Sequence, residues 1–264
     1  MSVLVILPGL DGSPQLQGAL PQALQKLPGI AGLQHQTLLY PPEQKLDYLA
    51  LARWVQPQLP PDQPFFLLGE SFGGPLALLL AGCGQGDARL PPPKHLRGVI
   101  LAASFATCAV PWAAPFRPAI AAWPAQALYA VPRKVWSWWL LGRWATPALL
   151  NALQQALRHS DPAVLQNRAV QALQPPALDL AALSVPLLAL RGAQDRLIPA
   201  HCAQALLQAP QHELHTIDGP HMLLQTQAEV CAPLVADFLL RHAGDWHPQQ
   251  QVGFATALAP HGNP

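Results

Sequence analysis

A serine lies at the centre of the segment GESFG at residues 69–73, which follows the pattern G-x-S-x-G. The apolar run PFFLL precedes this segment and PLALLLAG follows it, so we expect a strand, a sharp turn and a helix in that order. Such a turn leaves the hydroxyl of Ser71 exposed as a nucleophile. A glycine-rich turn of a nucleotide-binding unit is the alternative interpretation of the same residues.

The base that goes with this motif is a histidine late in the chain, because a serine hydroxyl is a weak nucleophile until a base takes its proton. Of the ten histidines, His221 in IDGPHMLLQ follows an expected strand, where a loop would bring it over the strand ends. His201, His212 and His215 are less favourably placed. The segment HELH at 212–215 is not the zinc motif H-E-x-x-H, and no metal site or cofactor is expected.

An acid that orients the histidine should follow a late strand. Asp195 in LLALRGAQDRLIP meets this condition, because an apolar run and a glycine turn precede it. Asp218, three residues before His221, is the rival, and Asp195 could instead cap a helix or pair with Arg196. The expected triad is therefore Ser71, Asp195 and His221.

An oxyanion intermediate needs two backbone N–H donors. One is expected from Phe72, the residue after the nucleophile, and the other from Leu10 in the loop PGLDGS after the first strand. Pro8 and Gly9 supply the tight turn in that loop. Asp11 is interpreted as a turn former.

Short apolar runs alternate with helical patterns along the chain, which predicts an α/β fold with a mostly parallel sheet of about six strands. The expected strands are 3–7, 37–40, 65–68, 98–102, 185–190 and 213–217. The expected helices are 16–27, 46–55, 76–81, 149–158, 164–173 and 225–241.

The alternation breaks between residues 107 and 184, which contain helical patterns and many prolines without a clear strand. A crossover between parallel strands needs only about a dozen residues, so this stretch is expected to be an inserted helical subdomain. The core domain would comprise residues 1–106 and 185–242. Residues 243–264 are rich in Gln, Pro and Gly and are expected to form a disordered tail.

The composition excludes several classes of protein. Charged residues make up 11% of the 264 residues and the net charge is +1, without the basic stripe of a nucleic-acid-binding protein. The four cysteines are widely spaced, which favours reduced thiols in a cytoplasmic protein. The N-terminal apolar run is too short for a signal peptide, and no run reaches the length of a membrane-spanning helix.

The segments LVILPGLDGS, LLGESFGG, LRGAQDRLIP and GPHMLL together resemble the α/β-hydrolase superfamily, in the family's order and over residues 3–241. The resemblance implies Ser71 as nucleophile, Asp195 and His221 as its partners, and Leu10 and Phe72 as oxyanion donors. It also implies a cap domain at 107–184. The opening PGLDG replaces the commoner His-Gly, and the two extra N-terminal strands of longer members are missing. Dehalogenases and epoxide hydrolases of this fold use aspartate at the elbow, so Ser71 argues against them.

The expected cap contains six of the eight tryptophans, together with six basic and two acidic residues. Trp136, Trp139 and Trp144 could line an acyl or aromatic pocket over the triad, or could simply pack the cap onto the core. Arg133 is a further candidate for substrate binding. The basic cap could recognise an acyl carrier protein or an anionic headgroup, or could be a solvated basic face. The layout is similar to that of a pimeloyl carrier-protein methyl esterase of the same superfamily.

The sequence thus predicts a serine hydrolase that cleaves a small or acyl-chain carboxylic ester through an acyl-enzyme. Its partner would be a small-molecule ester, or an ester carried by an acyl carrier protein. Thioester cleavage or acyl transfer could use the same triad. A non-catalytic ligand-binding protein on a hydrolase fold is the alternative from another class.

Overall fold

The computed structural model describes residues 2–30 and 32–244 of the chain. Most of the tail that is expected to be disordered, residues 245–264, lies outside the described residues. No helix in the described part of the chain is both long and apolar enough to span a membrane.

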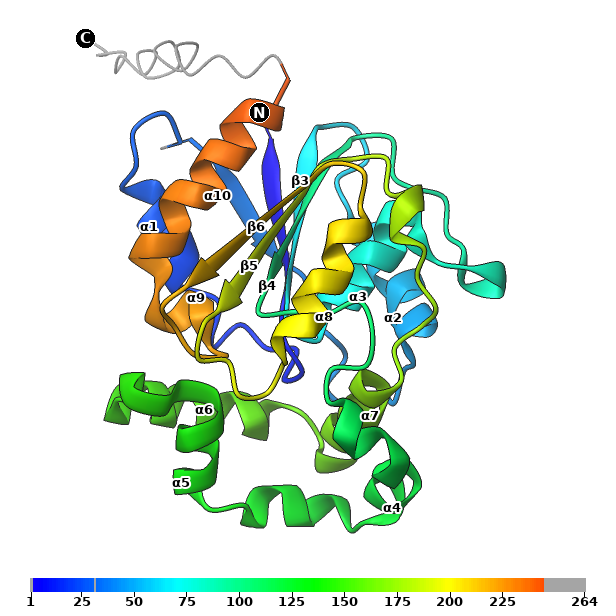
Figure 1. The fold of residues 1–264 in the computed structure, drawn as a ribbon, viewed down its shortest axis with the longest axis vertical. Coiled ribbons are helices and arrows are strands. Elements are labelled where there is room, and N and C mark those ends of the chain that lie inside the picture. Colours follow the sequence, from blue (N-terminus) through cyan, green and yellow to red (C-terminus); the bar gives the residue numbers. More distant parts are fainter. Residues whose placement is uncertain (1, 31, 245–264) are drawn as a thin grey trace, which may run out of the picture.

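The centre of the fold is a six-stranded parallel sheet with the strand order β2-β1-β3-β4-β5-β6 (Figure 1). The strands are β1 (Val3–Leu7), β2 (Gln34–Thr37), β3 (Phe65–Glu70), β4 (Leu96–Ala102), β5 (Leu187–Gly192) and β6 (His212–Ile217). This confirms the predicted α/β class and the number of strands. All six strands run in the same direction, so their carboxyl ends meet at one edge of the sheet, where α/β folds place their ligands.

Helices cover both faces of the sheet because its inner strands are apolar on both sides. Val3, Val5 and Leu7 of β1 pack on the side of α2 (Tyr48–Val55) and α3 (Gly73–Leu78). Leu4 and Ile6 point the other way, toward α1 (Ala19–Gln25) and α10 (Ala228–His242). Two shorter helices, α8 (Ala200–Gln204) and α9 (Leu223–Thr226), follow β5 and β6.

The second strand lies three residues earlier than the sequence predicts. The sequence places it at residues 37–40, but β2 is the polar, largely exposed segment QHQT at one edge of the sheet. The apolar residues Leu38 and Tyr40 belong instead to the loop after the strand, and both are buried in the core. The hydroxyl of Tyr40 donates to the carbonyl of Pro8 at 2.9 Å. The apolar pattern at residues 37–40 therefore reflects the burial of the loop and does not indicate the exposed strand.

Most of the residues between β4 and β5 form helices that lie together beyond the carboxyl ends of the strands (Figure 1). The α-helices among them are α4 (Arg117–Ala122), α5 (Arg133–Trp136), α6 (Pro147–His159) and α7 (Pro162–Leu173). Helices α6 and α7 contain the predicted helices 149–158 and 164–173. Each begins with a proline, behind a capping side chain from Thr146 or Asp161. We refer to residues 107–184 as the inserted segment.

Candidate active site

Ser71 lies in the tight turn between β3 and α3, with a left-handed backbone at φ 48°. Non-glycine residues rarely adopt this conformation, and it is held by the surrounding structure. The Ser71 N–H donates to the carbonyl of Ala102 at 2.9 Å, and the Ser104 hydroxyl donates to the Ser71 carbonyl at 2.6 Å. A side chain at Gly73 would collide with the carbonyl of Leu7, so only glycine lets helix and strand approach this closely.

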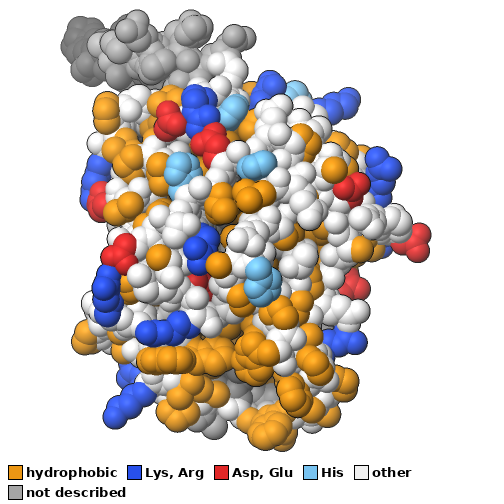
Figure 2. All heavy atoms as spheres, in the orientation of Figure 1, with side chains coloured by type: hydrophobic (Ala, Val, Ile, Leu, Met, Phe, Trp, Pro, Cys, Tyr) orange, Lys and Arg blue, Asp and Glu red, His pale blue; other side chains and the backbone are white. Residues whose placement is uncertain are grey.

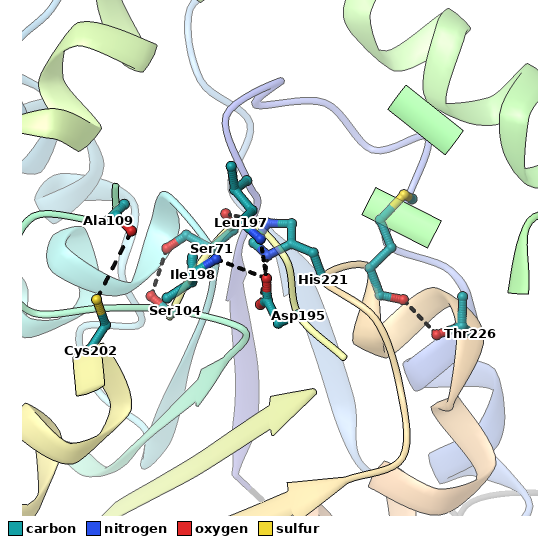
Figure 3. A network of polar contacts seen from close by, with 10 residues as sticks. Ser71, Ser104, Ala109, Asp195, Leu197, Ile198, Cys202, His221 and Thr226 are labelled. Atoms are coloured by element: carbon teal, nitrogen blue, oxygen red, sulfur yellow. Dashed lines mark hydrogen bonds and ion pairs between the residues drawn. The ribbon is translucent and has the colours of Figure 1, made fainter. Parts of the chain in front are cut away.

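The three expected triad residues meet at the carboxyl ends of the strands (Figure 3). The Oγ of Ser71 lies 3.0 Å from Nε2 of His221, and Nδ1 of His221 lies 2.9 Å from Oδ2 of Asp195. The other carboxylate oxygen of Asp195 accepts the backbone N–H groups of Leu197 and Ile198, at 2.8 and 2.9 Å. Asp195 therefore caps its own loop and also orients the imidazole.

The rival acid does not reach the histidine. Asp218 is exposed and forms an ion pair with Arg143 at 2.5 Å. Arg196, a possible partner of Asp195, instead donates to the carbonyl of Trp138 at 2.5 Å.

The electrostatics of the His221–Asp195 pair favour a charged imidazolium. Burial alone would lower the pKa of His221, but the charge and hydrogen bond of Asp195, with a further contribution from Glu70, raise it above the usual value. Burial alone would raise the pKa of Asp195, but His221 and the two backbone donors lower it. Asp195 thus stays ionised, and its charge stabilises the imidazolium that forms whenever His221 accepts a proton.

Of the two expected oxyanion donors, Phe72 directly follows Ser71 in the chain and Leu10 belongs to a loop that approaches Ser71. A side chain built on Gly9 would come within 3.9 Å of Cβ of Ser71, so the loop after β1 lies against the nucleophile. Phe72 begins the turn into α3 and its ring stacks on Tyr48 at 4.5 Å. Among the described residues, the backbone N–H groups of Leu10 and Phe72 donate to no carbonyl.

The model of the alpha/beta hydrolase family matches residues 4–234, most of the chain and all of the residues at this site. The chain belongs to the alpha/beta hydrolase family. Among curated proteins, no sequence matches it.

Solved structures share the fold of this hydrolase at low sequence identity. The enol-lactonase from Burkholderia xenovorans LB400 is 18% identical with a TM-score of 0.71, and 90% of this chain and 91% of that chain are covered. An esterase from Exiguobacterium antarcticum is 14% identical with a TM-score of 0.70, covering 91% and 92%. A thermophilic esterase from Thermogutta terrifontis is 19% identical with a TM-score of 0.68, covering 92% and 90%.

Glu70 is a buried carboxylate that the sequence analysis missed. It directly precedes Ser71, and its two oxygens accept the side-chain amides of Gln17 and Gln225, at 2.9 and 2.7 Å. Burial and the nearby charge of Asp11 raise the pKa of Glu70, while the two amide hydrogen bonds and the charge of His221 oppose this rise. The signal in the sequence was a charged residue at the end of an otherwise apolar strand.

Arg168 is the second residue that the sequence analysis misplaced. Arg168 is one of the six basic residues of the expected cap, which the sequence interprets as a solvated or partner-binding face, but this residue is only 3% exposed. One guanidinium nitrogen donates to the carbonyls of Leu10 and Asp11, both at 3.0 Å, and the other donates to Pro41 at 2.9 Å. These carbonyls solvate the buried charge, and they tie α7 to the loop after β1.

Asp11 lies in the same loop and acts as the sequence predicts. Its carboxylate accepts the backbone N–H of Ser13 at 3.0 Å, the hydrogen bond of a tight turn. Burial raises the pKa of Asp11 despite this hydrogen bond. Within the described residues, no cluster of three or more His, Cys, Asp or Glu side chains could hold a metal ion.

The four substrate-binding candidates in the inserted segment have other neighbours. Trp136 packs against the cluster of Leu141, Leu153 and Met222. Trp139 meets the ring of Trp112 at 6.4 Å, Trp144 lies 4.3 Å from the guanidinium of Arg143, and Arg133 donates to Asn151 at 2.8 Å. In the described part of the chain, no hydrogen bond, ion pair or ring contact joins these four side chains to the triad residues.

Proposed function

We propose that this hydrolase cleaves carboxylic esters through an acyl-enzyme on Ser71. The observation that carries the proposal is the chain of short contacts from Ser71 Oγ through His221 to Asp195, at 3.0 and 2.9 Å. A nucleophile, a base and an orienting acid in hydrogen-bond reach are the parts that acyl transfer to serine requires.

The reaction has two halves. In the first, Nε2 of His221 takes the proton of Ser71 as Oγ attacks the ester carbonyl, and the Leu10 and Phe72 amides donate to the oxyanion. The intermediate collapses with loss of the alcohol, which receives the proton from His221. In the second half, His221 removes a proton from water, the hydroxide attacks the acyl-enzyme, and the acid leaves as the proton returns to Ser71.

The substrate class in this proposal is a small or acyl-chain ester. Esterases and an enol-lactonase are among the structures that share the fold, and the chemistry in their names is ester or lactone cleavage. The carrier-protein-linked ester has weaker support. Arg168 is buried and Arg143 is paired with Asp218, so two of the six basic residues of the inserted segment do not present an unpaired charge to a partner.

The test uses a series of p-nitrophenyl esters of increasing chain length and a fluorophosphonate probe. We expect Ser71→Ala to abolish labelling and to lower kcat by about a thousandfold or more, because members of a triad act as a unit. Ser184 is an exposed serine in the same chain, so Ser184→Ala is the matched control and should leave labelling and kcat unchanged.

Two outcomes would contradict the proposal. Full activity in Ser71→Ala would mean that Ser71 is not the nucleophile. Failure of the unaltered protein to react with the probe would favour a non-catalytic binding protein. Product analysis with an added alcohol or thiol separates hydrolysis from acyl transfer.

A further inference from the structure

One end of the molecule exposes large aromatic side chains. Five of the ten large hydrophobic side chains that are exposed in the described residues fall within residues 112–138 of the inserted segment. They are Trp112 and Trp123, each 65% exposed, Phe116 at 60%, Trp138 at 56% and Val135 at 43%. We call these five the aromatic face.

Several side chains of the aromatic face lie next to one another on the surface. The ring of Trp139 lies 6.4 Å from that of Trp112 and 6.5 Å from that of Trp138, so these three indoles form one continuous cluster. Figure 2 shows hydrophobic side chains gathered at the end of the molecule where Figure 1 places α4 and α5. A soluble protein rarely exposes contiguous apolar surface of this kind without a binding role.

The stretch of sequence that contains the aromatic face has charged residues of one sign only. No acidic residue occurs between Asp87 and Asp161 in the sequence. The aromatic face is accompanied by Arg117, Arg133 and Lys134, and the last two are exposed. Arg133 binds the neutral side chain of Asn151, so its charge is not offset there.

We propose that the aromatic face docks this hydrolase on an anionic lipid bilayer. Tryptophan is the side chain that membrane interfaces favour, because its indole has an apolar body and a polar N–H. Basic residues beside it are attracted to anionic headgroups and weaken their hold as salt is added. The protein would lie on the membrane without crossing it.

An anionic lipid surface can bind both the exposed tryptophans and the basic residues of this region, whereas a second copy of the chain or an acidic protein would suit only one of these two groups. A second copy of the chain would bring two basic surfaces into one interface, and like charges oppose such association. An acidic carrier protein would pair with the basic residues but would leave no apolar layer for Trp112 and Trp123.

Trp138 of the aromatic face and the nearby Leu140 make polar contacts with the triad loops. Arg196, next to Asp195, donates to the Trp138 carbonyl, and its guanidinium lies 4.5 Å from the Trp138 ring. The N–H of Met222, next to His221, donates to the Leu140 carbonyl at 3.0 Å. Docking would therefore hold the active site near the membrane. This step rests on the proposed function, and it points to lipophilic esters that partition into bilayers.

The experiment is sedimentation of the full chain with vesicles of phosphatidylcholine, with and without phosphatidylglycerol. We expect binding to the anionic vesicles that falls with added salt. Trp112→Ser with Trp123→Ser should weaken it by about tenfold or more, and so should Arg133→Gln with Lys134→Gln. The matched controls are Trp54→Ser on α2, and Lys94→Gln with Arg97→Gln near the amino end of β4.

Several results would overturn the proposal. The unaltered protein could fail to bind anionic vesicles, or the tryptophan variants could bind them as well as the unaltered protein does. The protein could also form a dimer in lipid-free ultracentrifugation that the tryptophan variants abolish. Binding of an acyl carrier protein that the aromatic variants abolish would also overturn it. Unchanged Tm in each variant shows that the loss is not unfolding. Ser71→Ala should bind vesicles normally, so failure of docking and failure of the proposed catalysis are told apart.

Discussion

Glu70 gives the site a second carboxylate that does not touch the base. The amides of Gln17 and Gln225 both donate to it, and this arrangement suits an ionised carboxylate, which only accepts hydrogen bonds. The negative charge of Glu70 acts on His221 through space and adds to that of Asp195. In the proposed reaction, Glu70 would therefore stabilise, without touching it, the imidazolium that forms when Ser71 attacks.

Replacing Glu70 by glutamine should move the pH profile. His221 must be neutral to accept a proton, so kcat/KM should fall as the pH drops through its pKa, which lies above the ordinary value of about 6.5. In Glu70→Gln, Asp195 is the remaining carboxylate that raises this pKa, so the acid limb should move to lower pH. We also expect kcat on the plateau to fall, because the imidazolium is less stabilised.

The control is Glu229→Gln, whose carboxylate pairs with Lys26 on the surface. Its pH profile should match that of the unaltered protein. An acid limb that stays in place in Glu70→Gln would mean that Glu70 has a purely structural role.

Among the elements, burial explains why four of the strands could be predicted from the sequence, although the largely polar β6 was also placed within one residue. Strands β1, β3, β4 and β5 are apolar on both faces, and their patterns were found within two residues. The edge strand β2 was misplaced because it is polar and the apolar residues belong to the following loop. The predicted helix 225–241 is broken at Gln227 into α9 and α10, a change that its apolar pattern does not reveal.

Some residues of the candidate site could be predicted from local sequence patterns and others could not. Ser71, Asp195 and His221 each follow a strand in a recognisable turn, so the sequence predicted residues that the structure brings together. Glu70 and Arg168 depend on partners far away in the chain. Gln225 is 155 residues from Glu70, and Leu10 is 158 residues from Arg168. Local patterns contain no information about such pairs.

Helix α7 supports the loop that contains Leu10, and Arg168 is the residue through which it does so. We expect Arg168→Lys to lower kcat by about tenfold to a hundredfold with little change in KM, because lysine lacks the planar fork that reaches several carbonyls at once. The Leu10 amide would then be less well placed for the oxyanion. Steady-state kinetics on a p-nitrophenyl ester measure this split between kcat and KM.

Arg158→Lys on α6 is the matched control, because Arg158 is exposed and should tolerate the change. A rise in KM at constant kcat in Arg168→Lys would contradict a role in holding the oxyanion loop. A lower Tm with unaltered kcat would indicate that Arg168 only stabilises the fold.

At the scale of the whole molecule, one of the apolar clusters that attach the inserted segment to the core lies near the triad. Leu141 is fully buried against Leu153 and against Met222, which follows His221 in the chain. The exposed residues Arg133 and Arg143 in this segment are sites for trypsin. The rate of cleavage there reports how often the segment opens, because a protease cuts the open form.

We expect Leu141→Ala to speed tryptic cleavage in the inserted segment by about tenfold or more. Loss of a buried leucine side chain costs about 2–5 kcal/mol, and this cluster joins α5 and α6 of the segment to Met222 of the core. Leu207→Ala, at a leucine that is 41% exposed, should leave the cleavage rate unchanged. Mass spectrometry of the first fragments locates the cut. If trypsin first cuts the Leu141→Ala protein in the core domain, the inserted segment and the core open together. If it first cuts at Arg133 or Arg143, the segment opens by itself, as expected for a cap that is a separate unit.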